Sequence, residues 1–355
     1  MLCPSLSRWV LASVYLLAAC PASAVAHDQP WKVQGKLLGE AEGSGFEKSE
    51  DVSGIACAPA ATLPRLCLLA DDETQGTQIV LLKKSELLAG EFIRLTSAMH
   101  GGDPLELDAE GVAYEDGNFY VTGSHGRPRH SDNPEKDKES NAKAAATRQI
   151  FRIALAASAV DMTTGRLVAL PAITPSSALT GILQSQPEIA PSYDRALADG
   201  GLTIEGIAVR DQRLYVGMRS PVIGTDAAVL SVATSAVFGG APAPSTLHRL
   251  ALGTDTAGQA RGVRDLARYR NGFLVLAGPV QDPPDNTAIR TGDYSIYSWD
   301  GENPPTGRHD LQAYGKKAKP EALQPIEGDD GHVRVLLLFD GPKEGAPRSI
   351  DVKLK

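Results

Sequence analysis

The sequence predicts an all-β fold, a single-domain β-propeller, and two observations support this fold class. The first is a hairpin unit that recurs along the 355 residues. In its clearest copy, residues 202–220, Glu205 and Gly206 precede a short apolar run, a polar turn and a second apolar run. The second is a turn dipeptide between the two apolar runs of three copies, where a tight hairpin needs positive φ. These dipeptides are Asp116-Gly117, Asn271-Gly272 and Asp330-Gly331.

The spacing of the repeat predicts five four-stranded blades. The copies are marked by Gly54, Gly111, Gly206, Leu266 and Ala322, which are separated by 57, 95, 60 and 56 residues. One blade therefore occupies somewhat under 60 residues. A sixth, degenerate blade within residues 150–200 is the alternative.

The long interval contains two insertions. Residues 127–148 are rich in Lys, Asp, Asn and Ser, and we expect an exposed loop excursion or lid there. Residues 176–197 lie between Pro-marked ends and are expected to include a short helix.

Strands outside the repeated hairpins complete the predicted blades. Residues 31–38 precede the first repeat and are expected to form the outer strand of the last blade, which would close the ring without a free edge. Third strands are expected at 149–155, 246–252, 294–299 and 349–354.

Composition limits the classes of partner. The hydrophobic fraction of 42% is typical of a globular protein with a core. A net charge of −8 and a pI near 5.4 argue against a nucleic-acid partner, which would require a basic face. A cation or a small-molecule ligand is easier to accommodate on such a chain.

Residues 1–26 have the pattern of an export signal. Arg8 is the only charge before an apolar run, and small residues at 22–26 offer a cleavage site. We therefore expect a periplasmic or secreted protein with its propeller domain at 27–355. Lipoprotein processing at Cys20, after Leu-Ala-Ala, is the alternative. No other long apolar run is present, so no transmembrane segment is expected.

Two cysteines remain after the predicted signal. Cys57 and Cys67 flank the turn of the first hairpin, and export would place them in an oxidising compartment. Because the two positions can face each other across the strands, we predict a disulfide. Two buried thiols are the alternative.

Several motifs resemble those of a known family. The Glu-Gly-Ile-Ala hairpins, Gly123-Ser124-His125-Gly126, residues 217–221 and the late Leu-Phe-Asp-Gly at 338–341 resemble the bacterial domain of unknown function family thirty-six-sixteen. The similarity covers essentially all of the mature chain. A more distant likeness joins the repeated strand to the esterase-like phytase and gluconolactonase-type propellers. The resemblance implies a propeller and supplies no activity.

Charged side chains are expected to meet at one mouth of the channel. In a propeller blade, the start of the innermost strand and the end of the second strand share a rim. This rule places four carboxylates there as candidate metal ligands: Glu110, Glu205, Asp265 and Glu321. It adds the candidate ligand-binding residues Asp71, Asp72 and Asp340 and the candidate catalytic residues His125 and Arg219.

The predicted rim suggests two kinds of chemistry. Crowded carboxylates repel one another unless a cation, an Arg or shared protons compensate, and Ca²⁺ is the favoured cation for oxygen ligands. Alternatively, each carboxylate accepts backbone hydrogen bonds and locks neighbouring blades together. His125 is a candidate general base, and Arg219 a candidate anchor for an anionic ligand.

Two classes of function follow from this rim. One is a metal-dependent ester or phosphoester hydrolase, and the other is a non-catalytic binding module for a protein or a ligand. The chain lacks a Gly-x-Ser-x-Gly elbow, His-Glu-x-x-His and a phosphate-binding Gly-rich loop.

Overall fold

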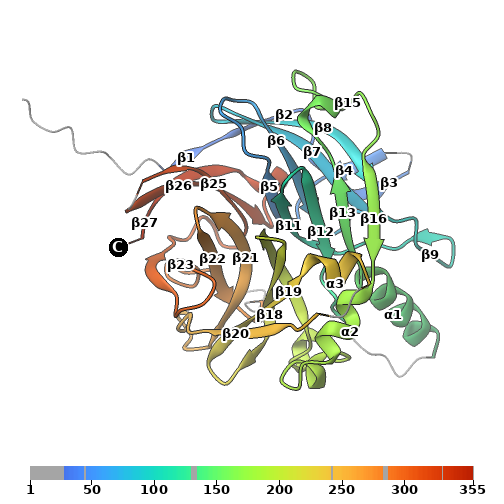
Figure 1. Ribbon diagram of the computed structural model, residues 1–355, viewed down its shortest axis with the longest axis vertical. Coiled ribbons are helices and arrows are strands. Elements are labelled where there is room, and N and C mark those ends of the chain that lie inside the picture. The colour runs from blue at the N-terminus through green and yellow to red at the C-terminus, as the bar shows by residue number, and fades with distance from the viewer. Residues whose placement is uncertain are drawn as a thin grey trace, which may run out of the picture.

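The computed structural model describes residues 28–43, 45–128, 134–240, 243–282, 287–329 and 331–354. The predicted signal peptide, Cys20 and Asp330 lie outside these ranges. The described residues form a five-bladed β-propeller whose blades follow one another in chain order (Figure 1). Five blades, rather than six, is therefore the observed number.

The blades are built from consecutive antiparallel strands. The first contains β5 (Val52–Cys57), β6 (Arg65–Asp71), β7 (Gly76–Lys83) and β8 (Glu86–Arg94). The second contains β11 (Ala109–Glu115), β12 (Asn118–Gly123), β13 (Ile150–Ala154) and β16 (Ala172–Ser176). The third contains β17 (Thr203–Arg210), β18 (Arg213–Ile223), β19 (Asp226–Ala233) and β20 (Thr246–Leu250).

The last two blades have the same order. The fourth contains β21 (Arg261–Tyr269), β22 (Gly272–Pro279), β23 (Ser295–Trp299) and β24 (Thr306–Asp310). The fifth contains β25 (Lys319–Gly328), β26 (His332–Asp340) and β27 (Arg348–Lys353), and its outer strand is β1 (Gln29–Pro30). The prediction of third strands is correct for β13, β23 and β27. Residues 246–252 instead supply a fourth strand, because β19 precedes them in the third blade.

Smaller elements decorate the ring. Three short hairpins are β3–β4 (Leu38–Glu42, Gly45–Lys48), β9–β10 (Met99–His100, Asp103–Pro104) and β14–β15 (Val160–Asp161, Arg166–Leu167). The helices are α1 (Pro134–Thr147), α2 (Ala178–Gln184) and α3 (Thr234–Phe238). Short 3-10 turns occur at Ala157–Ala159, Ala190–Ser192, Leu197–Asp199 and Lys343–Gly345.

Both insertions of the long interval contain helices. The segment expected as a loop excursion at 127–148 carries helix α1, and α2 is the short helix expected within 176–197.

The N-terminal strands close the ring in a way that differs from the prediction. Residues 31–38 were expected to pair with the last blade, but β1, just before them, does so, with Gln29 opposite Ser349. The next strand, β2 (Lys32–Gln34), pairs in parallel with β8 of the first blade. Trp31, between them, donates its backbone N–H to Pro347 over 2.7 Å. The chain thus clasps the fifth blade to the first, and Figure 1 shows β1 beside the C-terminal strands.

The innermost strands form a closed ring around the channel. Contacts join β5 to β11, β11 to β17, β17 to β21, β21 to β25, and β25 to β5. Glycines permit this close approach: a Cβ on Gly206 would lie 2.6 Å from the Cα of Asp265, and one on Gly111 would lie 2.9 Å from the backbone N of Ile207.

The apolar core is divided among the seams between blades. At the seam between the third and fourth blades, for example, Tyr215 and Val229 pack with Val263 and Phe273. A comparable buried cluster lies at each of the other seams that the described residues form. Every blade therefore depends on its neighbours for burial of its two faces.

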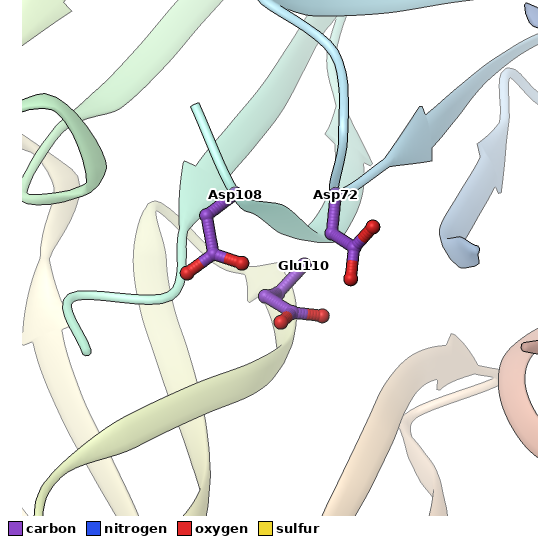
Figure 2. A group of neighbouring side chains, drawn as sticks. All are labelled: Asp72, Asp108 and Glu110. Atoms are coloured by element: carbon purple, nitrogen blue, oxygen red, sulfur yellow. The ribbon is translucent and has the colours of Figure 1, made fainter. Parts of the chain in front are cut away.

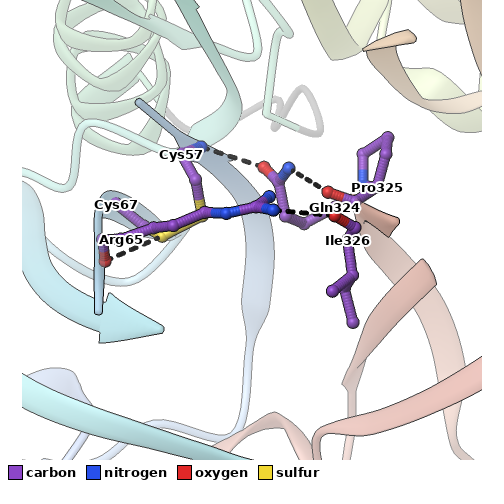
Figure 3. Close-up of a disulfide and its surroundings, with 6 residues drawn as sticks. All are labelled: Cys57, Arg65, Cys67, Gln324, Pro325 and Ile326. Atoms are coloured by element: carbon purple, nitrogen blue, oxygen red, sulfur yellow. Dashed lines mark hydrogen bonds between the residues drawn. A yellow bond between two sulfur atoms is a disulfide. The ribbon is translucent and has the colours of Figure 1, made fainter. Parts of the chain in front are cut away.

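The predicted disulfide is present. Cys57 ends β5 and lies directly opposite Cys67 of β6, with 3.9 Å between their Cα atoms. The fifth blade holds this hairpin (Figure 3): Gln324 accepts a hydrogen bond from the backbone N–H of Cys57 at 2.9 Å, and Arg65 donates to the carbonyl of Ile326 at 2.8 Å. The bridge therefore reinforces the first blade at the end of β5 opposite to the predicted acidic mouth.

Candidate functional site at the channel mouth

A β-bulge recurs at the same place in every innermost strand. The pairing register shifts between Val52 and Gly54, Ala109 and Gly111, Ile204 and Gly206, Val263 and Asp265, and Pro320 and Ala322. A bulge leaves one residue out of the ladder and redirects its side chain. The bulged residues are Ser53, Glu110, Glu205, Arg264 and Glu321. We call them the bulge ring, and charged members of it meet at the channel mouth.

Asp265 does not belong to this ring. The fourth blade places Arg264, not Asp265, at the position of Glu205 in the third blade. The Asp265 carboxylate is buried and accepts backbone N–H groups from Leu266 at 2.7 Å and from Leu323 at 2.6 Å. Asp265 therefore locks the fourth blade to the fifth, and it is not among the carboxylates that converge.

In one half of the channel mouth, arginine side chains neutralise the carboxylates. Arg219 of β18 donates to Glu205 at 3.1 Å, to Asp282 at 2.6 Å and to the carbonyl of Val280 at 2.6 Å. Arg264 contacts Glu321 and lies 3.8 Å from Glu205. Positive charges therefore lie against both Glu205 and Glu321. Because its donors are engaged within the protein, Arg219 is better placed to position Glu205 than to anchor a ligand.

In the other half, three carboxylates form no ion pair among the described residues, and Arg219 and Arg264 act on Asp108 and Glu110 only from a distance. Asp72 follows β6, Asp108 precedes β11, and Glu110 is the bulge of β11; one oxygen from each lies within 4.8 Å of the others (Figure 2). We call these three residues the carboxylate triad. Glu110 is 7% exposed; within the described residues its carboxylate forms no hydrogen bond or ion pair, although the positive charge of Arg264 is near enough to lower its pKa. The Oδ1 atom of Asp72 is buried and likewise has no hydrogen-bond partner there.

Burial and mutual repulsion shift the pKa values of the triad. Burial, the larger cause, raises the pKa of Asp108 to about 6, against a donated hydrogen bond from the Ser124 hydroxyl. Burial also raises the pKa of Asp72 and Glu110 well above their ordinary values, and neighbouring carboxylates raise both further. The negative form of the triad is therefore costly unless a cation accompanies it.

Asp71 and Asp340 lie near the triad but have other partners. Asp71 is buried and accepts hydrogen bonds from the Ser49 hydroxyl and the backbone N–H of Glu73, while burial raises its pKa to about 8. Asp340 forms an ion pair with Lys319. Neither residue belongs to the converging triad.

The repeat pattern does not predict Asp108, because it marks only the acidic residue next to the repeated Gly or small residue. The signal available was a second acidic residue two positions before Glu110, at the entrance of the strand. Asp108 adopts φ of 54°, a conformation that Asp tolerates better than most residues.

A cavity of about 370 Å³ opens beside the triad. Its lining includes Asp108 and Glu110 of the triad, but not Asp72, together with Glu205. The lining also includes Lys143 of α1 and Arg127, just before that helix. The insertion between β12 and β13 therefore forms part of the wall of a polar cavity next to the unpaired carboxylates.

His125 does not line this cavity. Its side chain is fully buried, its φ is 55°, and among the described residues neither ring nitrogen has a hydrogen-bond partner. Burial lowers the pKa of His125 to about 3, and the positive charge of Arg148 lowers it further. The geometry therefore gives His125 a place in the core rather than the position of a general base.

Buried, neutral His125 should make stability depend on pH. Its folded-state pKa of about 3 lies below the unfolded value of about 6.5, so its contribution is complete above pH 6.5 and declines as the pH falls. We expect the unfolding free energy of the wild type, relative to His125→Asn, to fall by about 2 kcal/mol from pH 7 to pH 5. Urea denaturation at both pH values measures this difference, with His332→Asn at an exposed imidazole as the control. Parallel profiles of the wild type and His125→Asn would show that folding does not disfavour the charged ring.

Comparisons with solved structures find similarities at low sequence identity, and they add no function. The native arabinanase Arb43A of Bacillus subtilis has 8% identity and a TM-score of 0.40, with 86% of this chain and 96% of that chain covered. A sialidase of Trypanosoma rangeli has 11% identity and a TM-score of 0.41, covering 92% and 58%. An exo-β-1,3-galactanase of Clostridium thermocellum has 8% identity and a TM-score of 0.42, covering 90% and 62%. None of these three is named as a phytase or a gluconolactonase, and that more distant likeness stays a prediction.

Within the described residues, no helix combines the length and apolar character needed to cross a membrane.

The sequence comparisons give a family. No curated protein matches the sequence. The family described as "Protein of unknown function (DUF3616)" matches residues 44–349, and the chain belongs to that family.

Proposed function

We propose that this chain is an exported propeller that binds a divalent cation, Ca²⁺ in first place, at the carboxylate triad and acts there as an ester or phosphoester hydrolase. The observation that carries the proposal is the convergence of the Asp72, Asp108 and Glu110 carboxylates, none of which forms an ion pair among the described residues. Export rests on the predicted signal segment and agrees with the Cys57–Cys67 disulfide, since such bonds persist in oxidising compartments.

The donor set fits a hard cation. Three carboxylates offer only oxygen, the ligand type that Ca²⁺ takes at about 2.3–2.6 Å in flexible geometry. The triad comes from three separate backbone positions, and the cavity beside it has room for waters that complete the coordination. Mg²⁺ demands a stricter octahedron and dehydrates reluctantly, so it is the second choice.

The cavity supports an anionic ligand. A cation at the triad would lie on its channel side, while Arg127 and Lys143 contribute positive charge on the wall formed by the insertion. Arg127 already donates to Asn141 at 2.9 Å and lies 3.7 Å from Asp194, and Lys143 lies 3.2 Å from Glu139 of its own helix. These exposed contacts hold little free energy, so Lys143 can turn toward a ligand. Arg127 and Lys143 thus replace Arg219 as our candidates for anion recognition.

The proposed chemistry divides between the ion and the chain. When bound, a divalent cation supplies a Lewis acid and lowers the pKa of a coordinated water. The triad holds that ion, Arg219 and Arg264 keep Glu205 and Glu321 compensated, and the cavity wall orients the anionic group of the ligand.

A non-catalytic binding module is the second candidate function. Among the described residues that line the cavity there is no His or Cys, and Ser124 donates its hydroxyl to Asp108. The described part of the cavity wall thus offers neither an imidazole base nor a thiol nucleophile. This observation favours either chemistry that depends on the cation or simple binding.

Thermal melts with chelator and with Ca²⁺ test the cation site. We expect Ca²⁺ to raise the melting temperature of the wild type by several degrees, since an ion at 100 times its Kd adds about 2.7 kcal/mol. Glu110→Gln should melt higher than the wild type in chelator, because repulsion is relieved, and should lose most of the gain from Ca²⁺. Asp265→Asn is the matched control: it should lower stability by about 1 kcal/mol equally in both conditions. Wild-type melts that are insensitive to Ca²⁺ and Mg²⁺ would contradict the cation site.

Turnover separates the two candidate functions. Purified protein with Ca²⁺ should hydrolyse at least one member of a panel of generic phosphoesters, carboxylic esters and lactones. Activity should disappear in chelator and in Glu110→Gln, whereas Asp265→Asn should keep it at temperatures where that variant is folded. A cation-dependent melt without turnover on any substrate of the panel would favour the binding module.

A further inference from the structure

Arg264 occupies a position that carries a carboxylate in three other blades. The bulge ring contains Glu110, Glu205 and Glu321, whereas the fourth blade supplies Arg264 at the equivalent register. The side chain of Arg264 is 1% exposed. One residue of the repeat thus brings a permanent positive charge into the same buried space as the three glutamates.

The three glutamates of the bulge ring have the spacing of a second cation site. One oxygen from each of Glu110, Glu205 and Glu321 lies within 4.8 Å of the others, and Glu110 also belongs to the carboxylate triad. The unpartnered Glu110 carboxylate, more than nine-tenths buried, is therefore shared by two ligand sets. Two-metal enzymes hold their ions in adjacent ligand sets of this kind.

The guanidinium of Arg264 lies against this second set. It contacts Glu321, approaches Glu205 to 3.8 Å, and donates to the carbonyl of Pro279 at 3.4 Å. The stem is closely packed, since a Cβ on Gly278 would lie 2.9 Å from the Cγ of Arg264. The absence of a side chain at Gly278 thus leaves room for the stem that carries the charge inward.

We propose that Arg264 is a built-in cation that takes the place of a second metal ion and limits the mouth to one exchangeable divalent cation. A guanidinium remains charged at all ordinary pH values and neutralises Glu205 and Glu321 without dissociating. It also repels a divalent ion from the glutamate set and leaves Glu110 to the triad. The binding of a cation at the triad is part of the function proposed above, and this inference rests on it. Arg264 acts as a specificity-determining residue that selects one-cation over two-cation chemistry.

Ca²⁺ titration calorimetry of three proteins tests this role. Wild type and Arg264→Lys, which keeps the charge, should each bind one ion. Arg264→Gln should bind two ions, melt lower than the wild type in chelator and recover stability in Ca²⁺, because the ion then replaces the lost charge. Adding Glu205→Gln to Arg264→Gln should remove the extra ion and relieve the instability in chelator.

The outcomes separate this inference from the proposed function. No ion in the wild type but one in Arg264→Gln would refute the triad site and uphold the role of Arg264. One ion in both would uphold the triad and refute the role of Arg264. An Arg264→Gln protein that neither folds alone nor is rescued by Ca²⁺ would also refute it, because the glutamate set would then have no useful affinity for a cation.

Discussion

Repulsion among buried carboxylates is the constraint on which the arrangement of the channel mouth depends. Glu110, Glu205 and Glu321 share a space in which each is less than one-tenth exposed. Ionised carboxylates in such surroundings need a positive partner or a proton. Arg219 and Arg264 provide that partner for Glu205 and Glu321, and the charge that stays without an ion pair at Glu110, Asp72 and Asp108 is the basis of the cation site that we propose there.

The fold creates this crowding through a repeated backbone feature. Each innermost strand is bulged at the same register, and four of the five blades thereby direct a charged side chain toward a common centre. Small residues such as Gly206 allow neighbouring inner strands to approach closely, and Asp265 fastens two of them. The ring is held at its seams by apolar clusters and by the N-terminal clasp of β1 and β2. A closed ring cannot open to separate the carboxylates without losing these contacts.

Most of the fold could be predicted from local sequence because hairpins and tight turns are local. The turn at Asp116-Gly117, with φ of 46° and 82°, is one example of such a signal. The strand that closes the ring was predicted at 31–38, a few residues after its observed position in β1, because a strand of two residues carries almost no sequence pattern. The strand β19 was missed for a different reason: Ala227 and Ala228 make it less distinctive than the repeated hairpins.

The location of the site at the channel mouth could be predicted from the sequence, but the charged residues that meet there could not all be identified. Aligning the repeat on acidic residues selected Asp265, although the register assigns its place to Arg264. A shift of one residue along a strand moves a side chain to the other face of the sheet. The bulge therefore decides whether Arg264 or Asp265 points into the channel mouth, and the sequence alone does not reveal the bulge. Likewise, the strand-end rule placed His125 near the rim but could not show that its ring turns into the core.

The position of a bound ion is the decisive observation for the proposed cation site. Crystals soaked in Ca²⁺ and measured at a wavelength where calcium scatters anomalously would locate the ion without reference to activity. We predict one strong peak at the mouth, about 2.3–2.6 Å from oxygens of Asp72, Asp108 and Glu110. A mouth without a peak, or a peak held between Glu205 and Glu321 while Arg264 is in place, would contradict this prediction.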